Sequence, residues 1–343
     1  MSVILPVLNE EAHLDACLAA IEAQTYRAIT EVLVADGGST DRSREIAVGH
    51  PRVRVLDNPA RIQAAGLNTA LREAAGEVVV RVDGHCVIAP DYVERCVAAL
   101  HLTGAAMVGG LMVPVEGRGC VGRAAGLAMR SRLGAGPARF HTGGRPGWVD
   151  TVYLGCYPAR LARAAGGYSL AVGVNEDAEL AHRLRPRGGV WFDPGIVASY
   201  VPRERLSAVA RQFFRYGLSR AATVRRHPES LAPRQLAAPL LLVALASPWR
   251  RWVVRGYAAL VASRVLTELP RDPAGAAALS LLLPAMHLSW GSGFLLGVTG
   301  LVPPPAPGSE SARYALQATP THDSPPLGGE RKPPDHRIVT GHS

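Results

Sequence analysis

Apolar residues in the first part of the chain alternate between short continuous runs and helical spacing. The runs are rich in Val, Ile and Leu, as expected for strands that are buried on both faces. Strands are predicted at residues 3–8, 31–35, 53–56, 77–82 and 106–115, and helices at 40–48, 61–74 and 90–100. A further helix after the first strand is marked on one face by Leu14, Cys17, Leu18 and Ile21. This alternation predicts βαβ units, and therefore an α/β fold with a mostly parallel sheet.

The middle of the chain has a weaker pattern. Residues 116–150 are rich in Gly and Arg, and we expect a mobile loop with a short helix near 122–132, placed to act as a lid. Residues 151–200 return to short elements and include a helix that begins near Glu176. Residues 203–226 have the pattern of a basic helix.

Long uncharged stretches dominate the last third of the chain. Residues 235–249 carry no charge, and neither do the 37 residues from 273 to 309. About 20 apolar residues span a bilayer, so the second stretch is long enough to cross one, with a kink at Pro284. We therefore divide the chain into a catalytic α/β domain at 1–230, a membrane-associated helical region at 231–302 and a disordered Pro/Gly-rich tail at 303–343.

Positive charge is concentrated in one segment. The net charge is +9, yet residues 1–200 hold 20 basic and 20 acidic side chains, whereas residues 201–264 hold 12 arginines against two glutamates. Phe213, Phe214 and Tyr216 within this segment could stack on bases, but the neighbouring apolar runs favour an anionic membrane over nucleic acid. Arginine beside apolar segments is typical of the cytoplasmic face of a membrane.

Cysteine usage indicates a reduced compartment. The five cysteines are scattered and none lies in a CxxC pair, which supports neither a disulfide framework nor a zinc site. The chain enters a strand at once, so we expect no signal peptide and a protein on the cytosolic side of the membrane.

Two predicted strand ends carry acids where an open α/β sheet binds its ligands. Asp36 follows the strand at 31–35, and Asp83 follows the strand at 77–82. Asp83 and His85 could face one divalent cation, and the imidazole favours Mn²⁺ over Mg²⁺. Each segment can equally be an ordinary turn, with Asp36 in a local cap and His85 in solvent.

Two later segments carry charges at helix positions. Glu176 and Asp177 follow Asn175 at a predicted helix start, where they could supply a general base or complement the helix dipole, with Asn175 as the cap. Arg211 and Arg215 share a helix face and could bind a diphosphate, or could simply face solvent or lipid.

The order of these segments resembles the family 2 inverting glycosyltransferases of the GT-A fold over about residues 1–220. The resemblance implies a Rossmann-like, mixed sheet with helices on both faces, and an enzyme that uses Mn²⁺ or Mg²⁺. It places the donor nucleotide sugar at Pro6, Asn9, Glu10, Asp36, Arg61 and Asp83, and the metal at Asp83 and His85. It places the catalytic base at Asp177 beside Glu176, and contacts to the diphosphate or the acceptor at Gln212, Arg215 and Gly155.

Two departures from the family pattern refine this expectation. His85 replaces the second acid of the metal-binding D-x-D motif, and Tyr216 replaces the tryptophan of the Q-x-x-R-W motif of processive members. The second change favours transfer of a single sugar. Residues 58–68 and 286–294 resemble transferases of succinoglycan-type exopolysaccharide synthesis in particular.

The resemblance therefore implies transfer of a sugar, UDP-linked in the donor, to a lipid-linked or saccharide acceptor at the cytoplasmic membrane. A polyisoprenyl-phosphate glycosyltransferase and a non-catalytic membrane protein that retains the fold stay open as alternatives. A nucleotidylyltransferase would need a Gly-rich basic loop after the first strand, where this chain has Asn9, Glu10 and Glu11.

Overall fold

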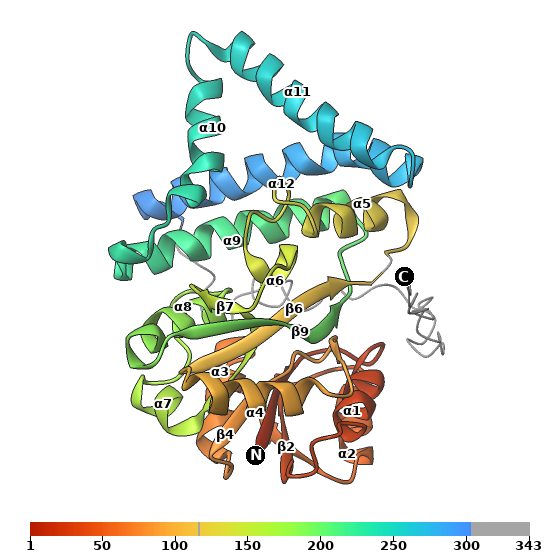
Figure 1. Ribbon diagram of the computed structural model, residues 1–343, viewed down its shortest axis with the longest axis vertical. Helices are drawn as coiled ribbons and strands as arrows, with labels where there is room; N and C mark the ends of the chain where they lie inside the picture. The colour runs from red at the N-terminus through yellow and green to blue at the C-terminus, as the bar shows by residue number, and fades with distance from the viewer. Residues whose placement is uncertain (116, 303–343) are drawn as a thin grey trace, which may run out of the picture.

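The computed structural model describes residues 1–115 and 117–302, and it has an α/β layer beneath a layer of helices (Figure 1). The strands are β1 (Ser2–Val7), β2 (Glu31–Asp36), β3 (Val53–Asp57), β4 (Val78–Arg81), β5 (Val87–Ile88), β6 (Met107–Pro114), β7 (Gly147–Val149), β8 (Tyr153–Pro158) and β9 (Val190–Tyr200). The helices of the α/β layer are α1 (Leu14–Glu22), α2 (Ser43–Gly49), α3 (Gln63–Glu73), α4 (Tyr92–Thr103), α6 (Arg139–Thr142), α7 (Ala159–Ala164) and α8 (Glu176–Leu184). The upper layer contains α5 (Gly119–Met129), α9 (Leu206–Arg226), α10 (Ala237–Leu245), α11 (Arg250–Glu268) and α12 (Pro273–Thr299).

Within the described residues, nine strands form one mixed sheet in the order β3-β2-β1-β4-β8-β6-β9-β5, with β7 paired to β9. The ladders that join β3, β2, β1 and β4 are parallel, and so is the ladder that joins β6 to β9. Val7 pairs with Asp36, and Asp36 pairs with Asp57, so three strand ends meet at one edge of the sheet. The expected mixed sheet of mostly parallel strands is confirmed.

Both faces of the sheet are covered because its strands alternate between two apolar cores. Along β1, Val3, Leu5 and Val7 join one core and Ile4 joins the other. The first core is completed by α1 and α4, and the second by α3, α7 and α8. Strands that are buried on both faces read as continuous apolar runs, which is why the sequence pattern located them well.

The helical layer is packed through small residues. Additional Cβ atoms at Gly217 and Gly293 would overlap backbone atoms of the facing helix, so α9 and α12 approach closely along their length. An ion pair of 3.1 Å between Arg123 of α5 and Asp272 ties the start of α12 to the same layer. The basic helix predicted at 203–226 is confirmed as α9.

The segment 117–150 is more ordered than its sequence predicted. It forms α5, α6 and β7, and β7 adds to the sheet beside β9. The predicted short helix corresponds to α5, whose buried face consists of the small side chains Ala124, Ala125 and Ala128. The expected short helix is therefore confirmed, whereas α6 and β7 form where the sequence analysis expected a loop.

The uncharged stretches near the C-terminus form α10 and α12, and α11 lies between them. Of the described residues, only α12 forms a helix long and apolar enough to cross a membrane. In Figure 1 this helix runs alongside α9, while α10 and α11 project from the layer and meet at an apex. The predicted tail at 303–343 lies outside the described residues, and the domain boundaries at 230 and 302 stay predictions.

Candidate active site

The loops after β1 and β2 are joined by hydrogen bonds. Asn9 has a left-handed backbone with φ of 55°, and its Oδ1 accepts a bond of 2.8 Å from the Thr40 N–H. The Glu10 N–H donates to Ser43 Oγ at 2.7 Å. These bonds hold the polar ends of the two strands side by side.

Asp36 is buried at the end of β2 and has local partners. Its carboxylate accepts hydrogen bonds from the Ser39 N–H at 3.2 Å and from Ser39 Oγ at 2.6 Å, and Arg44 lies 3.4 Å away. The structure therefore contains the local cap that was the simpler interpretation of this segment. Arg61 lies beside the same turn, with its guanidinium 3.5 Å from the Gly38 carbonyl oxygen.

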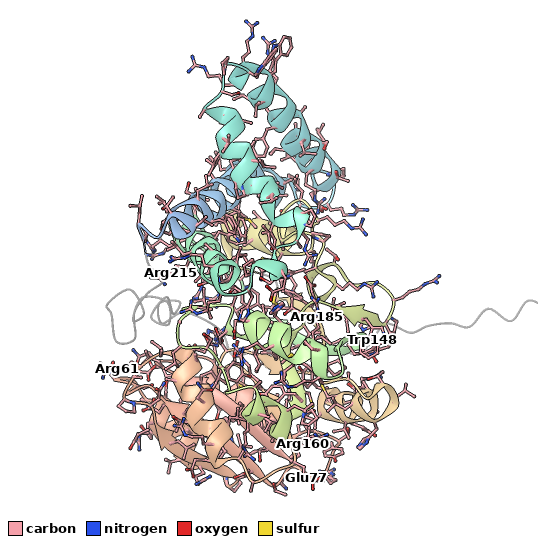
Figure 2. The ribbon with its side chains drawn as sticks, turned by 90° about the vertical axis from the view of Figure 1, so that its left-hand side faces the viewer. Arg61, Glu77, Trp148, Arg160, Arg185 and Arg215 are labelled. Carbon is pink, nitrogen blue, oxygen red and sulfur yellow. The ribbon has the colours of Figure 1, made fainter. Side chains whose placement is uncertain are left out.

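A cavity of about 1190 Å³ lies between the strand ends and the helical layer. This volume exceeds the usual range of small-molecule sites, so the cavity has room for two substrates. Among the predicted site residues, it is lined by Glu10, Asp83, His85, Glu176, Asp177, Gln212 and Arg215. Arg61 on the α/β layer and Arg215 on the helical layer lie on the same side of the molecule (Figure 2).

The remaining predicted residues are not among those that line this cavity. They are Pro6, Asn9, Asp36 and Arg61 in or after β1 to β3, and Gly155 in β8. Gly155 has φ of 115°, and a Cβ there would contact the Met107 side chain, so its backbone conformation explains the glycine. The first four residues surround the strand-end loops, next to Glu10.

Arg81 links the two acidic parts of the cavity. This arginine is 3% exposed at the end of β4, and its Nε lies 2.9 Å from Asp83 Oδ1. Its Nη2 lies 2.8 Å from Glu176 Oε1 at the start of α8. The sequence analysis gave Arg81 no role, although a charge inside the apolar strand run at 77–82 was a signal that it had buried partners.

Glu176 and Asp177 have environments that favour their protonated forms. Burial raises the pKa of Glu176 to about 7, and the nearby Asp177 adds to this rise while Arg81 opposes it. Burial also raises the pKa of Asp177, again against the influence of Arg81. Both shifts bring carboxylates closer to the pH range in which a general base works well.

The start of α8 corrects one detail of the sequence analysis. Asn175 has φ of 60° and forms no side-chain hydrogen bond to the helix end, so it is not the cap that its position suggested. Its backbone carbonyl oxygen accepts instead from the Glu179 N–H at 3.2 Å. The Asp177 carboxylate accepts from the Ala178 N–H at 2.8 Å, which fixes one of its oxygens.

His85 and Asp83 lie close enough to share a cation. Their ligand atoms and the Cys86 thiol all lie within 4.8 Å of one another. His85 Nδ1 is 3.0 Å from Glu10 Oε1, and this contact leaves Nε2 for a ligand. Burial is the largest single influence on the His85 imidazole and lowers its pKa, but the charge and hydrogen bond of Glu10 together with the charge of Asp83 raise the pKa overall. A carboxylate with an imidazole suits Mn²⁺ or Mg²⁺.

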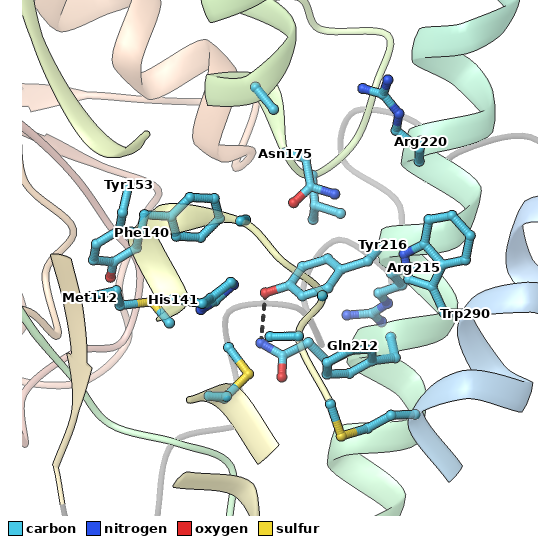
Figure 3. A pocket seen from close by; sticks show the side chains of 18 of the residues that line it. Met112, Phe140, His141, Tyr153, Asn175, Gln212, Arg215, Tyr216, Arg220 and Trp290 are labelled. Carbon is cyan, nitrogen blue, oxygen red and sulfur yellow. Dashed lines mark hydrogen bonds between the residues drawn. The ribbon is translucent and has the colours of Figure 1, made fainter. Parts of the chain in front are cut away.

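The helical wall of the cavity is formed by α9. Gln212 Nε2 donates to the Tyr216 hydroxyl at 2.9 Å, and Figure 3 shows this pair next to Arg215 and Trp290. Burial lowers the pKa of Arg215, and the positive charge of Arg211 lowers it further. An arginine in such surroundings gains from an anionic ligand.

The opposite wall contains residues that the sequence analysis did not select. Phe140 and His141 of α6 face the cavity with Tyr153 of β8 (Figure 3). The Nδ1 atom of His141 is buried without a hydrogen-bond partner, and burial lowers the pKa of this imidazole to about 3. No motif marked Phe140 and His141, because the segment at 116–150 had been interpreted as a loop with one short helix.

The chain resembles known proteins over most of its length. The family model described as Glycosyl transferase family 2 matches residues 2–125. The succinoglycan biosynthesis protein ExoA of Rhizobium meliloti (strain 1021) is 34% identical over 308 residues, which cover 85% of this chain and 93% of that protein. Glycosyltransferase AglE of Haloferax volcanii is 34% identical over 116 residues, which cover 32% of this chain and 38% of that protein.

A solved structure supports the fold. The mannosyltransferase PcManGT from Pyrobaculum calidifontis, in complex with GDP-Man and Mn²⁺, superposes with a TM-score of 0.55. It is 22% identical, and the match covers 86% of each chain. This likeness confirms the expected GT-A architecture.

Proposed function

Because the chain belongs to glycosyl transferase family 2, we propose that it moves one sugar from a nucleotide-diphosphate sugar to a saccharide or lipid-linked acceptor, with inversion at the anomeric carbon. A UDP-linked donor is the form we propose. The observation that carries this proposal is the bridge formed by Arg81. It joins Asp83, on the donor side, to Glu176, next to the proposed base, so that donor and acceptor meet in one cavity.

The donor would lie across the strand ends. Asn9, Asp36 and Arg61 would contact the nucleotide with Pro6 beneath them, and Glu10 would orient His85. Asp83 and His85 would hold a divalent cation, Mn²⁺ or Mg²⁺, and their spacing fits one. Such a cation neutralises negative charge on a leaving diphosphate.

Asp177 is the proposed general base. Both carboxylates line the cavity, but Glu176 forms an ion pair with Arg81, whereas Asp177 accepts one hydrogen bond from a neighbouring N–H. The Asp177 carboxylate takes the proton of the acceptor hydroxyl, and the hydroxyl oxygen forms a bond to the anomeric carbon. The bond from that carbon to the diphosphate oxygen breaks on the opposite face, and its electron pair leaves with the nucleotide diphosphate.

The remaining cavity residues would assist this displacement. Arg215 would stabilise the charge that develops on the diphosphate, because it is a partly buried cation. Gln212 is held by the Tyr216 hydroxyl and would contact the acceptor side. Gly155 in β8 is not among the residues that line the cavity, and its backbone conformation accounts for the glycine. A contact between Gly155 and the acceptor stays a prediction.

The test is the replacement of Asp177 by Asn. A general base contributes roughly 10²–10⁴-fold to the rate, so D177N should lose sugar transfer by that factor and still bind the donor. Release of nucleotide with acceptor present measures transfer, and donor titration measures binding. The exposed Glu45→Gln variant is the matched control and should keep full activity. Transfer by D177N at the wild-type rate would refute the assignment of the base.

Membrane association is also part of the proposal. Fifteen large apolar side chains of the described residues are exposed, and eleven of them lie between residues 240 and 301. Trp249 and Trp252 lie there beside Arg250, Arg251 and Arg255. Aromatic and arginine side chains together suit the headgroup region of an anionic membrane. We place the protein on the cytoplasmic face of the membrane, in exopolysaccharide or cell-envelope glycan synthesis.

A polyisoprenyl phosphate is a second candidate acceptor. The cavity is lined by arginines of α9 and also by apolar and aromatic side chains of α10 to α12, including Leu241, Met286 and Trp290. Such walls suit a phosphate head with an apolar chain. A panel of nucleotide sugars assayed with lipid phosphates and with lipid-linked saccharides would distinguish the two acceptors by the product formed.

A further inference from the structure

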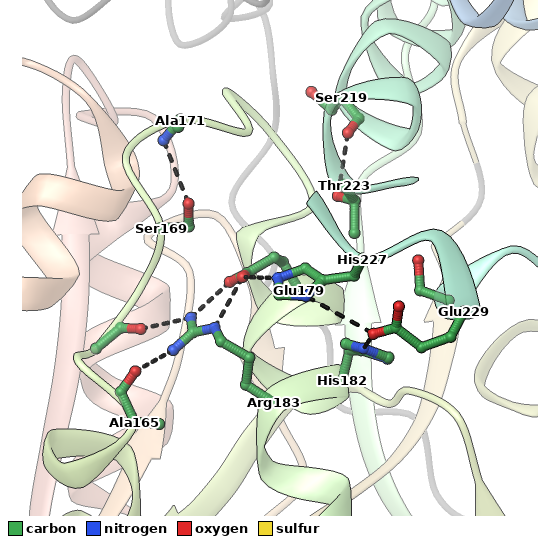
Figure 4. Close-up of polar contacts among 12 residues, drawn as sticks. Ala165, Ser169, Ala171, Glu179, His182, Arg183, Ser219, Thr223, His227 and Glu229 are labelled. Carbon is green, nitrogen blue, oxygen red and sulfur yellow. Dashed lines mark hydrogen bonds and ion pairs between the residues drawn. The ribbon is translucent and has the colours of Figure 1, made fainter. Parts of the chain in front are cut away.

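A cluster of two histidines and one glutamate lies outside the roles described so far. His182 is on α8, His227 directly follows α9, and Glu229 lies in the short 3-10 helix Pro228–Ser230 (Figure 4). The His182 Nε2 atom is 2.9 Å from Glu229 Oε1, and the His227 Nδ1 atom is 3.8 Å from the same oxygen. Ligand atoms of all three residues lie within 4.8 Å of one another.

These distances match the shape of a tetrahedral metal site. With metal-to-ligand distances of about 2.0–2.1 Å, two ligand atoms of a tetrahedral site are about 3.3 Å apart. The two contacts to Glu229 bracket this value, so only small side-chain movements are needed to place one ion between the three groups. The exposed Glu229 lies on a surface helix, where such movement costs little.

The orientation of His227 is fixed by a second carboxylate. Its Nε2 atom lies 3.2 Å from Glu179 Oε1, and Glu179 is 2% exposed and paired with Arg183. A carboxylate at this position favours a proton on Nε2 and leaves the Nδ1 lone pair directed at the cluster. Metal-binding histidines are commonly oriented by a carboxylate in this way. The ion pair with Arg183 alone would not require Glu179 to contact His227 as well.

The ligand types indicate which metal fits. Two neutral imidazoles and one carboxylate are a ligand set of Zn²⁺, with water in the fourth position. The Asp83 and His85 site offers one imidazole and a carboxylate and suits a harder cation. The two sites therefore differ in metal preference, and they lie at different positions along the chain.

We propose that His182, His227 and Glu229 bind one Zn²⁺ ion that ties α8 to the end of α9. The helix α8 begins with Glu176 and Asp177, and α9 carries Gln212 and Arg215. An ion between the far ends of these helices fixes the distance between the two walls of the cavity. Metal binding at this site does not depend on the reaction proposed above.

The test measures Zn²⁺ content in the full chain after removal of any affinity tag. Protein stripped with a chelator is dialysed against Zn²⁺ in excess Mg²⁺, which competes at oxygen-rich sites, and bound zinc is counted by mass spectrometry. The wild type should retain one equivalent more than the His182→Ala/His227→Ala double variant. The Glu229→Gln variant, altered at an exposed side chain, should bind Zn²⁺ more weakly with an unchanged circular dichroism spectrum.

The matched control is His50→Ala. His50 also contacts two carboxylates, at 2.9 Å from Glu22 and 3.4 Å from Asp15, but it is a single imidazole. This variant should bind as much Zn²⁺ as the wild type, and Glu179→Gln should weaken binding by roughly 10–100-fold. Equal zinc content in the wild type and in the folded Glu229→Gln and double variants would overturn the proposal and leave the cluster a hydrogen-bonded network.

Discussion

The two buried ion pairs of Arg81 lead to the most specific prediction about stability. Its guanidinium lies 2.8 Å from Glu176 and 2.9 Å from Asp83, and both the arginine and Glu176 are almost completely buried. Arg81→Met keeps a long apolar side chain but removes the positive charge between two carboxylates. Removal of one partner from a buried ion pair costs about 3–5 kcal/mol, because the remaining charge loses its compensation. We expect Arg81→Met to lower the free energy of unfolding by that amount near pH 8.

A second substitution separates lost charge from lost packing. In Arg81→Met/Glu176→Gln, one of the uncompensated carboxylates is also removed. The double variant should therefore be more stable than Arg81→Met alone, with an interaction of roughly 0.5–3 kcal/mol between the two sites. The defect of Arg81→Met should also shrink at acidic pH, because protonated carboxylates need no positive partner.

Urea unfolding followed by circular dichroism measures these differences. The control is Arg54→Met, since Arg54 pairs with Glu73 at 2.9 Å but is half exposed. Exposed pairs contribute about 0–1 kcal/mol, so this variant should be nearly as stable as the wild type. Equal losses in Arg81→Met and Arg54→Met would refute the reasoning, as would a double variant no more stable than Arg81→Met.

A titrating group, a packing contact and a surface charge each lead to a further prediction. Burial raises the pKa of Glu176 to about 7 from 4.5, so its stabilising contribution is complete below pH 4.5 and is lost as the pH rises through 7. Glu176→Gln should flatten the unfolding free energy across this window in urea titrations at successive pH values. Gly293→Val should cost about 1–3 kcal/mol by overpacking α12 against α9, whereas Gly256→Ala, in open space, should stabilise by up to about 1 kcal/mol in thermal unfolding. Reversal of Arg250 and Arg251 to Glu should weaken binding to phosphatidylserine vesicles by at least ~30-fold in sedimentation, and unchanged binding would contradict the membrane proposal.

The first half of the fold was predictable because its signals are local. Strands β1 to β4 are short apolar runs between helices with one apolar face, and the parallel order follows from this alternation. The ends of parallel strands meet at one edge, so the proximity of Asp36 and the Asn9 loop also followed from the pattern. In contrast, β7 is three residues long and depends on its pairing with β9, which no local pattern reveals.

The candidate site could be predicted only in part, because some of its signals lie within one segment and others depend on tertiary contacts. An arginine within an apolar strand, as at Arg81, signals that a buried charge must find a partner, because an unpaired one is too costly. The sequence cannot identify that partner, since Glu176 lies 95 residues further along the chain and is placed by the packing of α8 against the sheet. His182 and His227 pose the same problem, because His182 has an ordinary helix position, His227 directly follows a helix, and only the contact between α8 and the end of α9 brings them together. An ionisable residue within an apolar run therefore predicts that a partner exists, and the tertiary fold determines which residue that partner is.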